Sequence, residues 1–372
     1  MNILYDVCFI CFEELKSDAR TLNLVRTYVK FGKKVAVIAP VSPQDKDMFQ
    51  HEGVDIYPIA PPKKSRFWLR WLRFHNAARK FKKIKAKVFW ANDFYSLYTA
   101  QKFALSNKSK LFYDSREIYS ALGPLAQNQF KQGIITELER KLIDKVDRII
   151  VSGKMDEEYL RNHFDTSHPY TVIMNLPPYY DGIQSNLIRD ELGLPDSMKI
   201  LLYQGVLLKG RGIIPVIRAL PCIEDAVLVI IGWGPHQKDF EEVARALNVS
   251  DRVFFMGKKP YDELFGYTAS ADVGLSYIEP ITLSYRLALP NKLFEYCMAR
   301  IPSLVSDLPA MRQILAEYQI GELIQVGADP AEFVKVIRSI LDNKQKYAAN
   351  CEIASHKYSY SAQEPIILSL LK

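Results

Sequence analysis

The chain has 372 residues, of which 48% are hydrophobic and 24% charged, which excludes an intrinsically disordered protein and leaves room for two domains of ordinary size. Its net charge of +7 is unevenly divided, because residues 1–180 hold 29 Lys and Arg against 19 Asp and Glu, and residues 181–372 hold 20 against 23. This division predicts that the basic first half meets an anionic surface.

The first half alternates short apolar runs with amphipathic segments, beginning with an apolar run at residues 2–12. Ser17 or Asp18 is a suitable N-cap for a helix whose apolar stripe is Leu22, Val25 and Val29. No glycine-rich G-x-G-x-x-G joins the first strand to this helix, which argues against a nucleotide in this half. Helices separate the further expected strands, which are residues 35–39, 54–59, 88–91, 111–113, 148–151 and 170–173.

One segment of this half, residues 63–87, carries eleven Lys or Arg and no acidic residue. Its aromatic and apolar side chains recur in steps of three and four, which predicts a helix with one apolar stripe. The stripe consists of Phe67, Trp71, Phe74, Ala78 and Phe81, widened by Trp68 and Leu72. A basic amphipathic helix with aromatic residues is typical of a segment lying on an anionic membrane. The candidate membrane residues are Trp68, Arg70, Trp71, Arg73 and Phe74.

Two alternatives to the membrane interpretation remain open for this helix. It could be an ordinary domain helix, with its stripe packed on the sheet and its charges solvated. Nucleic acid could use the same charges, but no recognised RNA-binding module is present, so no nucleic-acid partner is expected.

Polar residues follow the strand at 111–113, in the sequence DSREIYS. Open α/β sheets bind ligands at the carboxyl ends of their strands, so Asp114, Arg116 and Glu117 are candidate site residues. A local turn closed by salt bridges is the alternative.

Residues 175–185, rich in Pro and Tyr, are expected to link two domains, predicted at residues 1–178 and 186–355. Strands and helices alternate again after this linker, which predicts an α/β protein with a parallel, doubly wound sheet in each half. The tail is expected to be mostly helical, with a C-terminal helix at 356–372 that returns to the first domain. The strands expected in the second half are residues 199–203, 226–231, 253–255, 273–276 and 303–306.

The stretch LPNKLFEYCMARIPSLVSD, residues 289–307, predicts the helix around which the site is organised. Pro290 suits the first helical position, and the helix is expected over residues 291–300. Lys292 stands in the first turn, where the helix dipole disfavours a cation unless an anion binds there too. Glu295 lies one turn further on the same face, where its carboxylate could accept hydrogen bonds from sugar hydroxyls. The alternative is a surface helix with an ordinary Lys–Glu pair.

A second helix start carries cations in the sequence GVLLKGRG, residues 205–212. It differs from a P-loop because Arg211 and Gly212 stand where Lys and Ser or Thr are needed. Lys209 and Arg211 repeat the placement of Lys292, and two such helix starts in one domain predict that both face one diphosphate. The nearby Gly232-x-Gly234 lacks a third glycine and is weak evidence for a phosphate loop.

Metal, redox and export signals are weak in this sequence. Cys8-x-x-Cys11 lies within an apolar strand, which predicts buried thiols. Asp45-x-Asp47 lies in a polar loop far from the other candidates, so no essential metal is expected. The five cysteines are odd in number and scattered, which suits a reducing compartment. No run of 18 apolar residues occurs, so no membrane-spanning helix is expected, and the N-terminus lacks the pattern of a signal peptide. A cytoplasmic protein, peripheral at the inner face of the membrane, is therefore expected.

Several motifs of the second half resemble those of the retaining glycosyltransferases of family 4, which have two Rossmann-like domains facing a cleft in the GT-B architecture. The motifs are YQG…RG (203–212), IIGWGP (230–235), DRVFFMG (251–257), ASADVGLS (269–276) and the LPNKLFEY stretch. The first half is similar in SDAR (17–20), WANDFYSL (90–97) and YDSREIY (113–119). These motifs occur in family order and extend over nearly the whole chain.

The resemblance implies that Arg211 and Lys292 grip the diphosphate of a nucleotide-sugar donor and that Glu295 holds its ribose. It also implies that the first half binds the acceptor, and that transfer retains configuration without a metal, a cofactor or an enzyme nucleophile. The implied donor-binding residues are Gly205, Lys209, Gly232, Gly234, Glu279, Pro290 and Asn291. The implied acceptor-side residues are Asp18, Arg20, Asp93, Asp114, Arg116 and Glu117.

Three departures from the family pattern concern the sugar end of the site. Leu287 stands where the first glutamate of the E-x7-E motif is expected, and Glu279 is a displaced candidate for that role. Arg116 occupies a place where relatives often carry His. Val206 occupies the place of a phosphate-binding Arg.

We therefore expect a hexosyltransferase that moves a sugar from a UDP- or GDP-sugar to a glycan or lipid-linked acceptor in surface polysaccharide biosynthesis. Two rival hypotheses are a nucleotide-sugar epimerase of the same fold and an inactive, membrane-associated paralogue that acts as a binding partner. The basic helix argues against the epimerase, whereas the missing glutamate and Arg116 favour the inactive paralogue.

Overall fold

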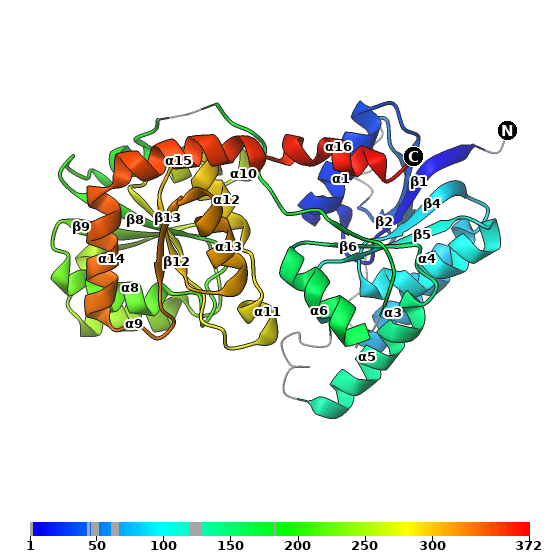
Figure 1. The fold of residues 1–372 in the computed structure, drawn as a ribbon, viewed down its shortest axis with the longest axis horizontal. Coiled ribbons are helices and arrows are strands. Elements are labelled where there is room, and N and C mark those ends of the chain that lie inside the picture. The colour runs from blue at the N-terminus through cyan, green and yellow to red at the C-terminus, as the bar shows by residue number, and fades with distance from the viewer. Residues whose placement is uncertain are drawn as a thin grey trace. The chain divides into compact units, whose positions relative to one another are not determined.

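The structure is a computed structural model that describes residues 3–42, 45, 52–60, 67–119, 128–164, 166–181 and 184–372. The chain forms two compact units: unit 1 comprises Met1–Asn175 and Gln363–Lys372, and unit 2 comprises Leu176–Ala362. In each unit, helices cover both faces of a parallel sheet (Figure 1). The predicted α/β class with two doubly wound parallel sheets is confirmed.

The sheet of unit 1 has seven strands in the order β3-β2-β1-β4-β5-β6-β7. Its strands are apolar because helices cover both faces; in β2, for example, all six residues are buried. The strand order reverses beside β1, which pairs with both β2 and β4. The strands are β1 (Leu4–Ile10), β2 (Val35–Pro40), β3 (Asp55–Ile59), β4 (Lys85–Ala91), β5 (Lys110–Ser115), β6 (Arg148–Val151) and β7 (Tyr170–Val172).

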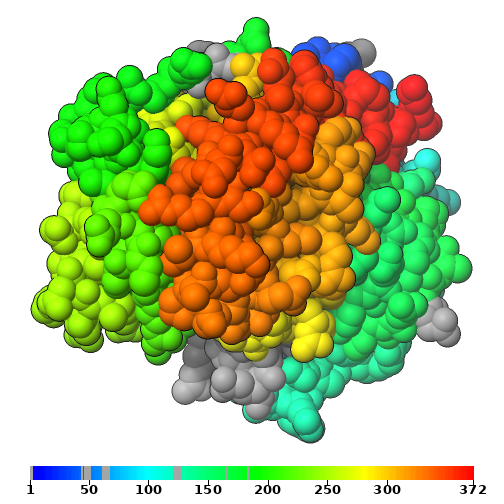
Figure 2. Space-filling view, turned by 60° about the vertical axis from the view of Figure 1, so that its left-hand side comes forward, coloured from blue at the N-terminus to red at the C-terminus, as the bar shows by residue number. Residues whose placement is uncertain are grey.

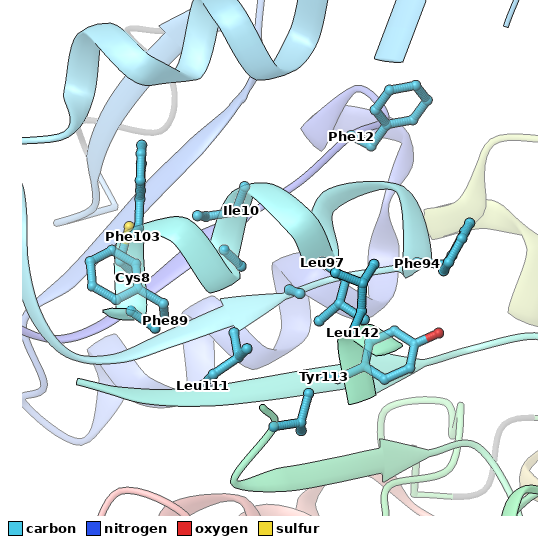
Figure 3. Close-up of a cluster of buried hydrophobic side chains, with 14 of the residues drawn as sticks. Cys8, Ile10, Phe12, Phe89, Phe94, Leu97, Phe103, Leu111, Tyr113 and Leu142 are labelled. Carbon is cyan, nitrogen blue, oxygen red and sulfur yellow. The ribbon is translucent and has the colours of Figure 1, made fainter. Parts of the chain in front are cut away.

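Four helices pack on one face of this sheet around a single apolar core, part of which Figure 3 shows. Phe89, Leu111 and Tyr113 come from the strands, and Leu97 and Phe103 come from the central helix. Aromatic rings pack edge to face between the layers; the ring centres of Phe89 and Phe103, for example, lie 5.8 Å apart, with 74° between the ring planes. The four helices are α3 (Phe67–Ala78), α4 (Phe94–Asn107), α5 (Gln129–Ile143) and α6 (Lys154–Phe164).

The opposite face of unit 1 is covered by α1 (Ala19–Lys30) and by α16 (Glu364–Ser369) from the C-terminus. The Tyr28 hydroxyl donates a 2.9 Å hydrogen bond to the Ile367 carbonyl oxygen, and Lys30 pairs with Glu364. The side-chain amide of Gln363 bonds both the N–H and the carbonyl oxygen of Met174, at 2.7 and 3.1 Å. These contacts join the last ten residues of the chain to unit 1.

The sheet of unit 2 has six strands in the order β10-β9-β8-β11-β12-β13. They are β8 (Lys199–Gln204), β9 (Ala226–Ile231), β10 (Val253–Gly257), β11 (Val273–Ser276), β12 (Ser303–Ser306) and β13 (Gly321–Ile324). The last strand was not predicted, because its four residues, GELI, are too short and too polar to give a periodic signal. It pairs with β12 at the edge of the sheet.

Two apolar clusters lie on the two faces of this second sheet. α14 and α15, orange in Figure 2, form part of the outer surface of the unit. One face carries α8 (Ile213–Ala219), α9 (Gln237–Ala246) and α14 (Pro330–Asp342), and the other carries α7 (Leu187–Leu192), α10 (Tyr261–Ala269) and α12 (Asn291–Met298). The remaining helices are α11 (Leu283–Arg286), α13 (Pro309–Tyr318) and α15 (Lys344–Lys357).

Candidate functional site

The candidate site of unit 2 is built on the first turn of α12. The helix begins at Asn291, and Pro290 precedes it with an extended backbone (φ −75°, ψ 137°), so the prediction that Pro290 is the first helical residue is wrong by one position. The helix ends at Met298 because Arg300 adopts a left-handed conformation (φ 59°). No side chain caps the first turn and no acidic residue stands in it, which suits the turn to an anion, although the Leu293 N–H already donates a 3.1 Å bond to the Pro290 carbonyl oxygen.

Lys292 is buried in this first turn, with 7% of its surface exposed. Its ammonium nitrogen Nζ has no hydrogen-bond partner among the described residues, and it lies 3.7 Å from the centre of the Tyr203 ring. Burial lowers the pKa of Lys292 well below its ordinary value, and the positive charge of Arg211 lowers it further, while Glu295 acts in the opposite direction. A buried cation without a partner requires an explanation, because its desolvation is uncompensated.

Glu295 lies one turn after Lys292 and belongs to a buried polar chain. The Gln204 amide, at the end of β8, donates a hydrogen bond to the Glu295 carboxylate and accepts one of 2.8 Å from the Thr268 hydroxyl. Burial raises the pKa of Glu295, whereas the bond from Gln204 and the charge of Lys292 lower it. Gln204 was missed at the sequence level, although a polar residue that ends an apolar strand is the same signal that pointed to Asp114.

Arg211 lies in the loop between β8 and α8. Its Nε donates a 3.1 Å hydrogen bond to the Tyr285 hydroxyl, and its guanidinium lies 4.3 Å from the centre of the Tyr285 ring. Gly212 follows with a φ of 79°, and a Cβ there would lie 2.7 Å from the Tyr277 side chain, so glycine lets the loop close onto β11. Lys209, in the same loop, is exposed.

The other glycines predicted to bind the donor pack loops against each other. A Cβ on Gly232, whose φ is 145°, would lie 1.9 Å from the carbonyl oxygen of Gly205, and one on Gly234 would lie 2.4 Å from that of Leu207. The Leu207 N–H also donates a 3.0 Å bond to the Trp233 carbonyl oxygen. Close approach of two loops therefore explains these glycines without a ligand.

The segment that carries Glu279 packs on the same loop. The Glu279 N–H donates a 2.9 Å hydrogen bond to the Gly210 carbonyl oxygen, and a Cβ on Gly210 would touch Ile281 at 2.9 Å.

The structure brings Arg211, Lys292 and Glu295 into electrostatic contact, with Gln204 bound to Glu295. We call these four residues the α12 site.

A second cluster lies at the carboxyl edge of the sheet in unit 1. Arg20 pairs with both oxygens of Asp114 at 2.9 Å, and Asp114 is fully buried. Arg116 donates to both oxygens of Asp18 at 2.7 Å and to Asp114 at 3.3 Å. We call Asp18, Arg20, Asp114 and Arg116 the Arg116 network. It resembles the turn closed by salt bridges that was the alternative interpretation of the sequence, but its salt bridges also reach Asp18 and Arg20 at the start of α1.

Two further residues predicted on the acceptor side lie near this network but serve differently. Asp93 caps α4, accepting a 2.6 Å bond from the Ser96 N–H, while the Ser96 hydroxyl reciprocates. Burial raises the pKa of Asp93 to about 6, and hydrogen bonds from Ser96 oppose this shift. Glu117 is exposed in the loop after β5.

The predicted membrane stripe of α3 lies mostly inside unit 1, so the prediction that it faces a membrane is wrong for Phe74 and Trp71. Phe74 is 5% exposed, and the Trp71 indole N–H donates a 3.0 Å bond to the Tyr95 carbonyl oxygen. Periodicity identified an apolar face, and α4 together with Phe12 covers it. Residues 63–66 of the predicted segment lie outside the described residues.

Another side of α3 carries exposed apolar residues. The exposed fractions are 54% for Trp68, 47% for Leu69 and 48% for Leu72. Arg73 is exposed beside them, whereas Arg70 pairs with Glu13 at 3.2 Å. Within the described ranges, no helix is long and apolar enough to cross a bilayer. The described ranges also contain no group of three or more His, Cys, Asp or Glu side chains that could hold a metal ion.

Two family models match the chain, one to each unit. Residues 17–175 match the model of the glycosyl transferase 4-like domain, and residues 184–358 match that of the glycosyl transferases group 1. Each match covers slightly less than half of the chain, and together they span most of it.

Individual relatives are distant. A D-inositol 3-phosphate glycosyltransferase of Corynebacterium kroppenstedtii is 20% identical over 241 residues, which cover 58% of this chain and 50% of that protein. The chain thus aligns with about half the length of that relative.

Solved structures share the fold over the full length. A sucrose-phosphate synthase from Thermosynechococcus elongatus superposes with a TM-score of 0.79 at 16% identity, covering 98% of this chain and 97% of that one. Anabaena HepE in complex with UDP gives a TM-score of 0.75 at 15% identity, covering 98% and 99%. The fold is therefore that of the GT-B glycosyltransferases, with two Rossmann-like units.

Proposed function

We propose that this chain, which joins a glycosyl transferase 4-like domain to a glycosyl transferases group 1 domain, transfers a hexose from a UDP- or GDP-sugar to a glycan or lipid-linked acceptor. Transfer retains the configuration of the sugar and needs no metal ion. The reaction serves the synthesis of a surface polysaccharide.

The observation that carries this proposal is the buried side-chain nitrogen of Lys292 at the start of α12, for which the described residues offer no hydrogen-bond acceptor. A cation at this end of a helix is unfavourable by itself, because the helix dipole is positive there. A bound diphosphate reverses the sign of that interaction and supplies the missing hydrogen-bond acceptors. HepE, whose fold is similar, has been solved with UDP and with UDP-glucose, which supports a nucleotide-sugar donor.

In the proposed mechanism, negative charge develops on the diphosphate as its bond to the sugar breaks. Arg211, Lys292 and the N–H groups of the first turn of α12 stabilise that charge. Arg211 first breaks its hydrogen bond to the Tyr285 hydroxyl, or keeps that bond and donates other N–H groups to a phosphate oxygen. The Glu295 carboxylate accepts hydrogen bonds from the ribose hydroxyls, because Gln204 occupies only part of its acceptor capacity.

One departure from the family pattern lies beside this site. Val206 stands where many relatives have a phosphate-binding Arg, and it is 49% exposed in the loop after β8. In the proposed mechanism the cations of the α12 site are therefore Arg211 and Lys292, with none from position 206. On the acceptor side, the guanidinium N–H groups of Arg116 donate hydrogen bonds to Asp18, Asp114 and Thr21. Arg116 thus holds the Arg116 network together, in a place where relatives often carry His.

An anionic membrane surface is the proposed location of the acceptor. The exposed Trp68, Leu69 and Leu72 of α3 would enter the lipid headgroup region, with Arg73 beside them. α5 packs with α3 against α4 and adds the exposed Phe130 and Ile134 near its own start. Both helices begin at the carboxyl edge of the sheet, because they follow parallel strands.

Vesicle flotation tests this surface. The double variant Trp68→Ser, Leu72→Ser should lower partitioning onto phosphatidylglycerol vesicles at least about tenfold, whereas the wild type should bind vesicles of phosphatidylcholine weakly. Leu105→Ser is the matched control, since Leu105 is 59% exposed near the C-terminal end of α4, far along the chain from the residues of the proposed surface. Equal flotation of the double variant and the control would refute the membrane surface.

Donor binding and turnover test the reaction. UDP or GDP at a hundredfold excess over Kd should stabilise the protein by about 2.7 kcal/mol. Arg211→Ala and Glu295→Gln should abolish transfer from a panel of nucleotide sugars, whereas Arg218→Ala, an exposed position on α8, should not. Undiminished transfer in either site variant would refute the assignment. Release of an epimerised sugar would favour the epimerase, and binding without turnover of any donor would favour the inactive paralogue.

A further inference from the structure

The surroundings of Lys292 raise the question of its charge before any ligand binds. The side chain is 7% exposed, and no hydrogen-bond acceptor within the described part of the chain reaches its Nζ. Lys292 is the second residue of α12 and stands in the turn where the positive end of the helix dipole lies. An ammonium group in this position has lost its water and gained no hydrogen-bond acceptor, only the contact with the Tyr203 ring.

Two charged groups and one aromatic ring act on Lys292 from the elements around it. Arg211, from the loop between β8 and α8, places a second positive charge nearby, and Glu295, on α12 itself, places a negative charge one turn away. Tyr203, on β8, presents the face of its ring, because its hydroxyl donates a 2.8 Å bond to the Val206 carbonyl oxygen. α10, which also contacts α12, contributes Tyr261, whose pKa responds to Glu295. β11 and β12 contribute buried serines at Ser276, Ser303 and Ser306.

These influences differ in sign, and burial decides between them. The face of Tyr203 and the carboxylate of Glu295 favour the charged lysine. Burial, Arg211 and the helix dipole favour the neutral amine, and burial has the largest effect on the pKa of Lys292, which lies well below its ordinary value. A lysine ammonium, unlike a guanidinium, can respond to such an environment by losing its proton.

We propose that Lys292 is uncharged in the ligand-free protein and takes up one proton from solvent when the diphosphate of a nucleotide binds at the α12 site. The inference rests on the proposed donor site. The lone pair of Nζ forms the new N–H bond, no other covalent bond changes, and the diphosphate oxygens accept from the resulting ammonium. The site thus carries one positive charge, on Arg211, while it is empty, and two when the anion arrives.

Calorimetry with UDP as the probe counts this proton. Binding is measured on the full chain at pH 8.5 in several buffers of different ionisation enthalpy, and the slope gives the protons exchanged. At this pH the terminal phosphate of UDP, with a pKa of about 6, and ordinary histidines, with a pKa of about 6.5, are already deprotonated. We expect an uptake of about one proton, and a UDP affinity that falls by up to about tenfold per pH unit above the pKa of the free lysine.

Two variants separate this effect from a general dependence on pH. Lys292→Arg keeps a permanent charge, so it should bind UDP with no proton uptake and with an affinity nearly independent of pH. Lys346→Arg is the matched control, since Lys346 also lies over a tyrosine ring, that of Tyr347, but is exposed. It should behave as the wild type does.

The wild-type measurement decides the matter even if Lys292→Arg does not fold. UDP binding with an enthalpy that is the same in all buffers, and an affinity that is flat from pH 7.5 to 9.5, would overturn the inference while leaving the donor site intact. Failure of UDP, GDP and ADP to bind at all would instead refute the donor site itself, and this inference with it.

Discussion

Replacing Lys292 by methionine should stabilise the ligand-free protein and abolish nucleotide binding. The side chains have similar length, and methionine fills irregular apolar space well. The substitution removes a polar group that is 93% buried and has no partner among the described residues, and it keeps the contact with the Tyr203 ring. We therefore expect the function of the site and the stability of unit 2 to change in opposite directions.

The magnitude follows from the cost of burying an unsatisfied polar group. Mutational data place that cost at about 1–3 kcal/mol, so Lys292→Met should raise the free energy of unfolding of unit 2 by a similar amount. A domain of this size gains roughly 2–4 °C in Tm per kcal/mol, which gives a rise of roughly 2–12 °C. The stabilisation by UDP, about 2.7 kcal/mol at a hundredfold excess over Kd, should disappear in the same variant.

Calorimetric melting of the wild type and of Lys292→Met, each with and without UDP, checks both halves of this prediction. Lys346→Met, at the exposed position over Tyr347, is the control and should shift Tm by less than about 1 °C. A Tm that falls in Lys292→Met would show that the side-chain nitrogen is well satisfied in the folded protein, which would refute the predicted stabilisation.

Three further predictions test other parts of the molecule. Arg116→Ala leaves the buried Asp114 with one cation fewer and should destabilise unit 1 by about 3 kcal/mol in urea titrations; a loss under about 1 kcal/mol would show that the network is unimportant for stability. Burial raises the pKa of Glu139 from 4.5 to about 7, so its contribution to stability is complete below pH 4.5 and is lost as the pH rises through 7, by roughly 3 kcal/mol. Glu139→Gln should therefore lose less stability than the wild type between pH 5 and pH 8, and an equal loss would contradict the assignment. Gly232→Ala places a Cβ 1.9 Å from a backbone oxygen and should lower the free energy of unfolding by more than about 3 kcal/mol. The control Gly327→Ala, whose Cβ would have no atom within 4 Å but whose φ is 81°, should lower it by about 1 kcal/mol. Equal melting temperatures of the two variants would show that the loop adapts.

Local patterns in the sequence were sufficient for most of the fold. Alternating apolar runs and amphipathic segments predicted two parallel sheets, because strands that are covered on both faces have to be apolar throughout. β13 was not predicted, because four residues, of which only Leu323 and Ile324 are large and apolar, carry no period of their own. The apolar stripe of α3 was found correctly, but its partner was not, since a period shows which face is apolar and not whether protein or lipid covers it.

The same limit applies to the two clusters. Lys292 and Glu295 were found together because both lie on one helix, at a spacing that local geometry fixes. Gln204 binds Glu295 from a strand 91 residues earlier in the chain, and Arg116 reaches Asp18 across 98 residues. No local pattern predicts such pairs, because they form only when separate strands bring their carboxyl ends together.

By itself, the sequence determined where strands and helices alternate, where α12 begins within one residue, and that cations stand at two helix starts. These are consequences of backbone preference and side-chain period, which act over a few neighbouring residues. The tertiary structure alone decided that Lys292 is buried with no hydrogen-bond acceptor among the described residues, that Arg116 is held by two aspartates and that Trp71 and Phe74 lie inside unit 1. Burial and the identity of a partner are properties of the packed chain, because they depend on which distant residues exclude water from a side chain.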